Sequence, residues 1–275
     1  RLEKVYQNKG VATGISSGYS DFDQMTSGFH ESDLVILAAR PAMGKTAFAL
    51  NIALNAAMKS NKAVLLFSLE MSSSQLLQRL LAIDAGIALQ KIRNGFLDPD
   101  DWGKLGLSSM RLSNSEINIA DLPNVNVLEI RAIARRLKAA GKLDMIIIDY
   151  LQLIRGSSSK GDNRQQEISE ISRALKGIAR ELDIPVIALS QLSRAPEMRS
   201  DRRPMLSDLR ESGAIEQDAD MVIFLYRDDY YNEESEDKGI TEVIIGKQRN
   251  GPVGTVKLKY FHEYTRFGNF TSKID

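Results

Sequence analysis

Five short apolar runs, separated by stretches with helical periodicity, constrain the fold of this chain more than any other feature. Each run is rich in Val, Ile and Leu and lacks an alternating polar face, which is typical of a strand buried in a parallel sheet. The runs span Asp33–Ala39, Ala63–Leu69, Leu143–Ile148, Ile184–Leu189 and Met221–Tyr226. This repetition of strand and helix predicts an α/β fold in which a mostly parallel central sheet is flanked by helices.

The stretches between the runs carry helix signals. Apolar residues recur at spacings of three and four in Asn163–Leu182, so one face of the predicted helix is apolar. Ser72 and Gln75 fit a capping box, which predicts that a helix begins there. Further helices are predicted over Thr46–Ser60, with one apolar face, and over Val127–Ala140.

The C-terminal part of the chain follows a different pattern. The segments Thr241–Gly246 and Thr255–Phe261 flank an Asn-Gly pair at 250–251, which is a turn signal. This arrangement predicts an antiparallel hairpin appended to the parallel sheet.

Residues 1–14 are polar and lack apolar periodicity, and we interpret them as a linker or arm. One domain is therefore expected over residues 15–275. Because the chain begins at Arg1 rather than at methionine, we expect it to be processed or cut from something longer.

The composition excludes several classes of protein. The chain of 275 residues has no Cys, which excludes disulfide-stapled folds and Cys-ligated metal sites, and its two His disfavour a His-rich metal site. No apolar run approaches the ~20 residues that span a bilayer, so we expect a cytoplasmic protein without a membrane partner. The 36 basic residues equal the 36 acidic ones. Taken alone, that neutrality argues against nucleic-acid binding, unless unlike charges lie on different faces.

The strongest motif is the octapeptide 39–46, Ala-Arg-Pro-Ala-Met-Gly-Lys-Thr. It matches the phosphate-binding loop of nucleotide-hydrolysing enzymes at every fixed position except the first, where Ala39 replaces Gly. Lys45 would reach the β- and γ-phosphates, and Thr46 would offer its hydroxyl to Mg²⁺. The residues expected to surround the phosphates with backbone groups are Arg40, Pro41, Ala42, Met43 and Gly44. A chance strand–turn–helix is the alternative, and the flanking strand and helix signals disfavour it.

Two acidic residues close other predicted strands. Asp149 follows four apolar residues and is predicted to hold Mg²⁺, although an Asp at a strand end is also common without that role. Glu70 closes the run 63–69 and is predicted to orient or deprotonate the attacking water. The alternative for Glu70 is a carboxylate favoured near a helix N-terminus, but Ser72 already provides that cap.

Four further polar residues stay undecided on spacing alone. Gln191 ends the fourth run and is either a sensor of the γ-phosphate or a polar strand end without a duty. Lys247 and Arg249 lie at the hairpin turn, as a solvated basic turn or as cations delivered to a neighbour's γ-phosphate. Arg79, on the helix after Glu70, is equally open.

A resemblance rests on six motifs that occur in order. They are Ala-Arg-Pro-Ala-Met-Gly-Lys-Thr (39–46), Ser-Leu-Glu-Met-Ser (68–72), Ile-Ile-Asp-Tyr-Leu-Gln (147–152), Ser-Gln-Leu-Ser-Arg (190–194), Asp-Leu-Arg-Glu-Ser-Gly-Ala-Ile-Glu-Gln-Asp-Ala-Asp (208–220) and Gly-Lys-Gln-Arg-Asn-Gly (246–251). Together they resemble the C-terminal motor domain of the DnaB-type bacterial replicative DNA helicases. The resemblance covers about residues 13–270. It implies a RecA-like P-loop NTPase fold.

The resemblance also implies an activity and an assembly. It implies a helicase motor for DNA replication that hydrolyses ATP with Mg²⁺ and unwinds duplex DNA in the 5′ to 3′ direction. Lys247 and Arg249 would reach ATP bound by the next subunit, which implies a homo-oligomer, most simply a hexameric ring. Gln191 would couple the state of the ATP to the DNA-facing loop, and Arg79 joins the nucleotide-binding residues.

The family's DNA loop matches Arg210, Glu211 and Gly213, which would grip single-stranded DNA in the central channel. Without the resemblance, residues 207–220 are equally well interpreted as a helix of alternating charge. The resemblance further implies primase, a helicase loader and other replisome and primosome components as partners. Such helicases also carry an N-terminal domain and a linker, of which we expect only a short basic arm, Arg1–Gly10, to precede the motor in this sequence.

Local charge fits this interpretation. Segments 155–164 and 194–210 each have two more basic than acidic residues and no aromatic residue, which favours gripping of the DNA backbone over base stacking. The acidic loop Asp228–Lys238 is expected to be merely solvated. Two other hypotheses stay open: a RecA-like strand-exchange or signalling ATPase without unwinding activity, and a nucleotide-gated binding module with negligible hydrolysis.

Overall fold

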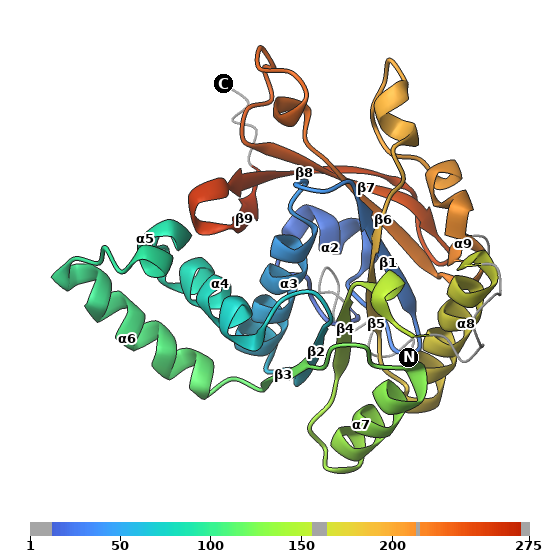
Figure 1. Ribbon diagram of the computed structural model, residues 1–275, viewed down its shortest axis with the longest axis horizontal. Helices are drawn as coiled ribbons and strands as arrows, with labels where there is room; N and C mark the ends of the chain where they lie inside the picture. Colours follow the sequence, from blue (N-terminus) through green and yellow to red (C-terminus); the bar gives the residue numbers. More distant parts are fainter. Residues whose placement is uncertain (1–12, 156–163, 213–214, 271–275) are drawn as a thin grey trace.

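A nine-stranded sheet forms the centre of the molecule, with strand order β3-β2-β4-β5-β1-β6-β7-β8-β9 (Figure 1). The computed structural model describes residues 13–155, 164–212 and 215–270, and for residues 210–212 the backbone alone. Six strands are parallel: β1 (Leu34–Ala39), β2 (Val64–Ser68), β3 (Ile117–Asp121), β4 (Met145–Asp149), β5 (Val186–Gln191) and β6 (Met221–Tyr226). The predicted α/β class is confirmed.

Three antiparallel strands extend the sheet beyond β6. They are β7 (Ile240–Gln248), β8 (Gly254–Phe261) and β9 (Arg266–Asn269). The predicted hairpin corresponds to β7 and β8, which pair on either side of the Asn-Gly turn. The four-residue strand β9 was not predicted, because it is too short to show a periodic pattern.

Helices cover both faces of the sheet (Figure 1). The described helices are α2 (Ser20–Thr26), α3 (Lys45–Ser60), α4 (Ser73–Ala85), α5 (Leu89–Asn94), α6 (Pro99–Ser113), α7 (Val127–Ala139), α8 (Arg164–Leu182) and α9 (Ile215–Asp218). Strand β1 shows why its run has no polar face: Val35 and Leu37 belong to the core beside α3, whereas Leu34 and Ile36 belong to the core beside α8. Both faces of β1 are therefore buried in hydrophobic core.

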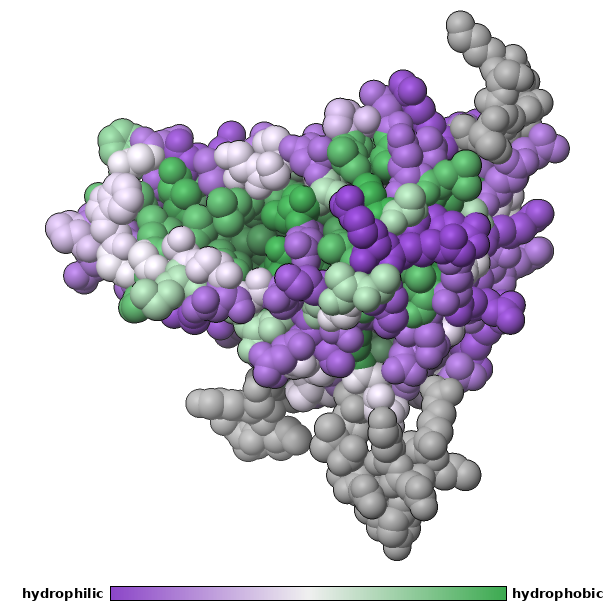
Figure 2. Space-filling view, turned by 90° about the horizontal axis from the view of Figure 1, so that it is seen from below, coloured by the Kyte–Doolittle hydropathy of each residue, from purple (hydrophilic) through white to green (hydrophobic). Residues whose placement is uncertain are grey.

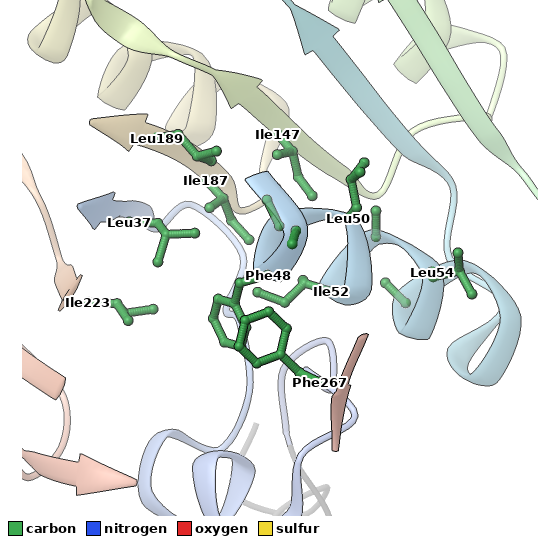
Figure 3. Packing of buried hydrophobic residues seen from close by; sticks show 14 of the residues in the cluster. Leu37, Phe48, Leu50, Ile52, Leu54, Ile147, Ile187, Leu189, Ile223 and Phe267 are labelled. Carbon is green, nitrogen blue, oxygen red and sulfur yellow. The ribbon is translucent and has the colours of Figure 1, made fainter. Parts of the chain in front are cut away.

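Helix α3 is more deeply buried than its predicted single apolar face required. Phe48 meets the ring of Phe267 edge-on, with centroids 5.2 Å apart (Figure 3). Phe48 also stacks on Tyr19, with centroids 5.6 Å apart. Phe267 lies on β9, so the unpredicted strand covers a side of α3 that the sequence pattern left open. This packing anchors the helix whose first turn follows the phosphate loop.

Phe48→Ala is expected to lower the free energy of unfolding by about 3–5 kcal/mol, because it removes a ring from a close-packed core. Phe96→Ala is the matched control, since Phe96 is 77% exposed and its loss should change the free energy by less than about 0.5 kcal/mol. Urea unfolding of both variants measures the difference. Equal destabilisation by the two substitutions would contradict this packing.

The α5–α6 arm projects from one end of the molecule and carries exposed apolar side chains (Figure 1). They are Phe96, Trp102, Leu107 and Met110. Apolar surface is visible at the left-hand end of Figure 2, where this arm lies. Among the described residues, no helix combines the length and the apolar character that crossing a membrane requires.

The acidic loop is more than a solvated surface, which corrects that expectation. Arg227 pairs with Asp229 at 3.1 Å, and Lys257 of β8 pairs with Asp237 at 2.8 Å. The Tyr226 hydroxyl donates a hydrogen bond to Asp228. These contacts tie the loop to β6 and β8.

Candidate functional site

The phosphate loop lies between the end of β1 and the start of α3. Gly44 occupies the left-handed region, with φ of 89°, and a Cβ atom there would lie 3.3 Å from the ring of Phe267. No side chain caps the start of α3, and no acidic residue lies in its first turn. The first backbone N–H groups of α3 are therefore available to an anion, and the helix dipole favours negative charge there.

The predicted loop residues do not all face the same space. Pro41, Ala42 and Gly44 line a pocket of about 1330 Å³ together with Lys45 and Thr46. The Met43 side chain does not line this pocket.

The Met43 side chain is 1% exposed and packs in the hydrophobic core. Only the Met43 backbone remains for a ligand. Arg40 lines the pocket, but its Nε donates to Glu197 at 2.9 Å and its NH1 donates to the carbonyl oxygen of Leu192. The Arg40 guanidinium therefore ties the loop to the segment after β5.

Thr46 lines this pocket, and Asp149, the other residue predicted to hold Mg²⁺, lies against it. The Thr46 hydroxyl donates to Oδ2 of Asp149 over 2.6 Å. Asp149 is 4% exposed, and its Oδ1 has no hydrogen-bond partner within the described part of the chain. Burial raises the pKa of Asp149, while the Thr46 hydrogen bond and the Lys45 charge oppose that rise.

These donors fit a divalent cation. An orphaned buried carboxylate oxygen beside a hydroxyl presents the hard oxygen ligands that Mg²⁺ prefers, and Mg²⁺ typically takes few protein ligands and completes its shell with phosphates and water. Accordingly, no cluster of three or more His, Cys, Asp or Glu side chains suited to a metal occurs among the residues described.

The Lys45 ammonium is buried, and two nearby carboxylates act on it. Burial lowers the pKa of its ammonium group, and the charges of Asp149 and Glu70 act in the opposite direction. Its Nζ lies 4.9 Å from the ring centroid of Tyr150. A desolvated cation interacts strongly with an anion that enters, so Lys45 is well placed for a phosphate.

Glu70, Arg79 and Gln191 all line the same pocket. Glu70 follows β2 and lies outside the Ser72–Gln75 capping box, which is present as predicted. The charge of Glu70 contributes to the pKa shifts of both Lys45 and Asp149, so the carboxylates and the ammonium act on one another.

Gln191 ends β5 directly beside Ala39, the last residue of β1. Its backbone N–H donates to the side chain of Gln152, whose Nε2 donates to the hydroxyl of Ser190. Gln152, in the short 3₁₀ turn after β4, thus links two strand ends at the pocket. Spacing alone did not identify Gln152, because its contacts depend on how the two strand ends are apposed.

Lys247 and Arg249 lie near the amino ends of the parallel strands, whereas the phosphate loop lies at the carboxyl end of β1. Lys247 pairs with Val222, which pairs with Ile36, three residues before the end of β1. The separation from the end of β1 is therefore about 10 Å along the strands and about 10 Å across them.

The side chains of Lys247 and Arg249 also turn away from the phosphate loop. Lys247 Nζ donates to the carbonyl oxygen of Glu216 at 2.5 Å, and Arg249 NH2 donates to that of Gln217 at 2.8 Å. Burial and the charge of Arg249 lower the pKa of Lys247. Within one chain these cations do not reach its own nucleotide pocket.

The predicted DNA loop is only partly described. Gly213 lies outside the described residues, as do 156–163 of the other basic segment. Arg210 and Glu211 lie on the 3₁₀ segment η3 (Leu206–Ser212), described there as backbone.

Two of the five arginines in segment 194–210 are engaged within the fold. Arg199 makes a bidentate salt bridge to the buried Asp208, and Arg203 makes another to Glu242 of β7. Neither guanidinium is therefore free to contact a phosphate chain, although the excess of two basic residues still holds for the segment as a whole.

The pocket also has a wall that the sequence did not reveal. It is formed by α5 and by residues around the 3₁₀ turn η5 (His262–Tyr264). The Tyr260 ring lies between Phe267, at 4.6 Å, and the guanidinium of Arg227, at 4.9 Å. Gly95, which caps the C-terminus of α5, is a local signal of where that helix ends.

Comparison with known proteins assigns the family. The model of the family described as "DnaB-like helicase C terminal domain" matches residues 14–269. The chain is 58% identical over its full length to the replicative DNA helicase DnaB of Geobacillus stearothermophilus and, to the same extent, to the replicative DNA helicase DnaC of Bacillus subtilis (strain 168). It spans 60% of the length of each of these relatives.

Solved structures agree with the sequence comparisons. One solved structure, described as an ATPase domain, superposes with a TM-score of 0.94 at 49% identity, covering 98% of this chain and 96% of that one. A DnaB-like replicative helicase, described with its interactions with primase, superposes with a TM-score of 0.93 at 48% identity, covering 98% and 65%. The RecA-like fold and the resemblance are thereby confirmed, and the chain belongs to the family of DnaB-like helicase C-terminal domains.

Proposed function

We propose that this chain is the motor of an ATP-dependent replicative DNA helicase, which hydrolyses ATP between the subunits of a ring and unwinds duplex DNA while moving 5′ to 3′ on a single strand. The observation that carries the proposal is that the residues expected to act on ATP lie at two separate places in the chain. The phosphate loop and Glu70 line one pocket, and Asp149 is bonded to Thr46 of that loop, while Lys247 and Arg249 lie near the opposite ends of the parallel strands.

The pocket residues bind the phosphates of ATP and activate the water that attacks them. The α3 N-terminus and Lys45 hold the phosphates, and Thr46 and Asp149 would hold Mg²⁺, which would supply positive charge to balance that of the phosphates. Glu70 orients the attacking water and accepts its proton. Gln191 contacts the γ-phosphate from the end of β5, and Arg79 closes the pocket from α4.

The second half of the site comes from another subunit. Lys247 and Arg249 point away from their own pocket, and a ring places them against the nucleotide of a neighbour, where they stabilise transition-state charge. The apolar side chains of the α5–α6 arm support assembly, because an exposed apolar patch of this kind marks an interaction surface.

The remaining partners follow from the relatives. Single-stranded DNA would be gripped through its phosphate backbone by the loop that contains Arg210 and Gly213, with Glu211 organising Arg210. Primase, a loader and other replisome components would bind the full-length cytoplasmic protein, since one similar structure is described with its interactions with primase. Because the chain is neutral overall, a ring that concentrates its basic loops should bind DNA more tightly than a dilute monomer.

Unwinding of a forked duplex by the full-length protein tests this function. ATP-dependent strand separation that requires a 5′ single-stranded tail is the expected result. Hydrolysis stimulated by DNA without strand separation would favour a strand-exchange or signalling ATPase. Nucleotide-dependent DNA binding without turnover would favour a nucleotide-gated module.

Asp149→Asn is expected to raise the Mg²⁺ concentration for half-maximal ATP hydrolysis by about 10- to 100-fold, because a neutral amide replaces the orphaned carboxylate oxygen. Asp144→Asn is the matched control, at the opposite end of the same strand, where Asp144 bonds the backbone N–H of Ala63. Titration of Mg²⁺ at fixed ATP measures the change. An unaltered Mg²⁺ dependence in Asp149→Asn would remove Asp149 from the metal site.

A further inference from the structure

Asp220 is a buried carboxylate between α9 and β6 that has no part in the reaction described above. It is 7% exposed. Its Oδ2 accepts hydrogen bonds from the backbone N–H of Leu34, at 2.8 Å, and from the ammonium of Lys176, at 2.5 Å. These donors come from β1 and α8, two rigid elements, so the carboxylate is fixed in place.

The second oxygen of Asp220 faces Arg249. Arg249 Nε lies 3.6 Å from Oδ1 of Asp220, and the backbone N–H of Arg249 donates to the Asp220 carbonyl oxygen over 2.9 Å. Arg249 NH2 is bound to the carbonyl oxygen of Gln217. The remaining terminal nitrogen, NH1, makes no hydrogen bond to the described part of the chain, and the side chain is 50% exposed.

We propose that Asp220 is a positioning residue, which holds the Arg249 guanidinium so that its free edge points toward the nucleotide of the neighbouring subunit. This inference rests on the proposed function, in which Arg249 acts in trans. A long side chain at a turn otherwise samples many rotamers, and an arginine misplaced by about 1 Å can cost about 100-fold in rate. The two carboxylate oxygens of Asp220 have different roles. Oδ2 joins β1 to α8, and Oδ1 orients the Arg249 guanidinium.

This division makes the two roles separable by substitution. In Asp220→Asn, the amide oxygen still accepts from Leu34 and Lys176, while an N–H group replaces the oxygen that faces Arg249. The variant is expected to keep its affinity for ATP and to hydrolyse it about 10- to 100-fold more slowly in assembled rings. Lys176→Met is the matched control, because it removes the other partner of Asp220 without touching Arg249, and its turnover should stay within about twofold of the unmodified protein.

Mixed rings show in which subunit the defect lies. Lys45→Ala subunits lack a working phosphate loop but keep Arg249, so mixing them with Asp220→Asn subunits should restore hydrolysis at the shared interfaces. Mixing Asp220→Asn with Arg249→Ala subunits should restore none above the Asp220→Asn level. A general folding defect in Asp220→Asn would affect both mixtures alike. Recovery with Lys45→Ala but not with Arg249→Ala would therefore exclude such a defect.

The reference mixture of Lys45→Ala with Arg249→Ala separates this inference from the proposed function. If that mixture shows no recovery, the trans arrangement itself is wrong. If it recovers while Asp220→Asn with Lys45→Ala does not, or if Asp220→Asn alone turns over normally, Asp220 does not position Arg249. Should Asp220→Asn fail to assemble, the double variant Asp220→Asn/Lys176→Met, which removes the buried charge pair together, enters the same mixtures with the same expectation.

Discussion

Arg249→Ala is expected to lower the rate of ATP hydrolysis by assembled rings about a thousandfold, the scale typical of a lost arginine finger. Its affinity for ATP should be unchanged, because the phosphate loop of the same chain lies near the opposite ends of the parallel strands. Lys247→Ala is expected to have a smaller effect, since its Nζ already donates to the carbonyl oxygens of Glu216 and Gln217.

Steady-state hydrolysis and a separate titration of nucleotide binding measure the two quantities. Arg136→Ala on α7 is the matched control, because this exposed arginine lies on a helix away from the pocket and from β7. Turnover by assembled Arg249→Ala rings within about tenfold of the unmodified rate would exclude a finger role, given the usual size of that effect.

The strands that position the pocket were predictable because burial on both faces leaves a wholly apolar run. β1, β2, β4, β5 and β6 all lie at their predicted places. The edge strand β3 was not predicted, because Ile117–Asp121 is only half-buried and its apolar residues are spaced among polar ones. Helix α6 contains Gly103 and Gly106 and packs on one side only, so its pattern was too weak to be recognised.

The nucleotide-binding half of the site was predictable for a geometric reason. The carboxyl ends of parallel strands share one edge of the sheet, so polar residues that end β2, β4 and β5 must approach the loop that ends β1. The motif describes backbone positions, so it could not predict that the Met43 side chain packs in the core.

Contacts across long sequence separations were beyond any local pattern. Asp220 bonds Leu34 over 186 residues, and Arg203 reaches Glu242 over 39. A net charge computed over a segment counts such arginines as free. A net charge, whether of the whole chain or of segment 194–210, therefore does not record which arginines are already paired.

Glu70→Gln is expected to slow ATP hydrolysis about 100- to 10,000-fold, because the amide keeps the size of the side chain but accepts no proton from the water. ATP affinity should persist, since Lys45, Thr46 and Asp149 are untouched. Rings of this variant should therefore hold ATP and DNA without unwinding.

Glu263→Gln is the matched control for that substitution. Glu263 lines the same pocket and is likewise exposed, but unlike Glu70 it contributes to the pKa shift of neither Lys45 nor Asp149. Single-turnover hydrolysis separates the chemical step from product release. If Glu70→Gln and Glu263→Gln hydrolyse bound ATP at equal rates, the water is activated by another group, and a nucleotide-gated module becomes the better account of the pocket.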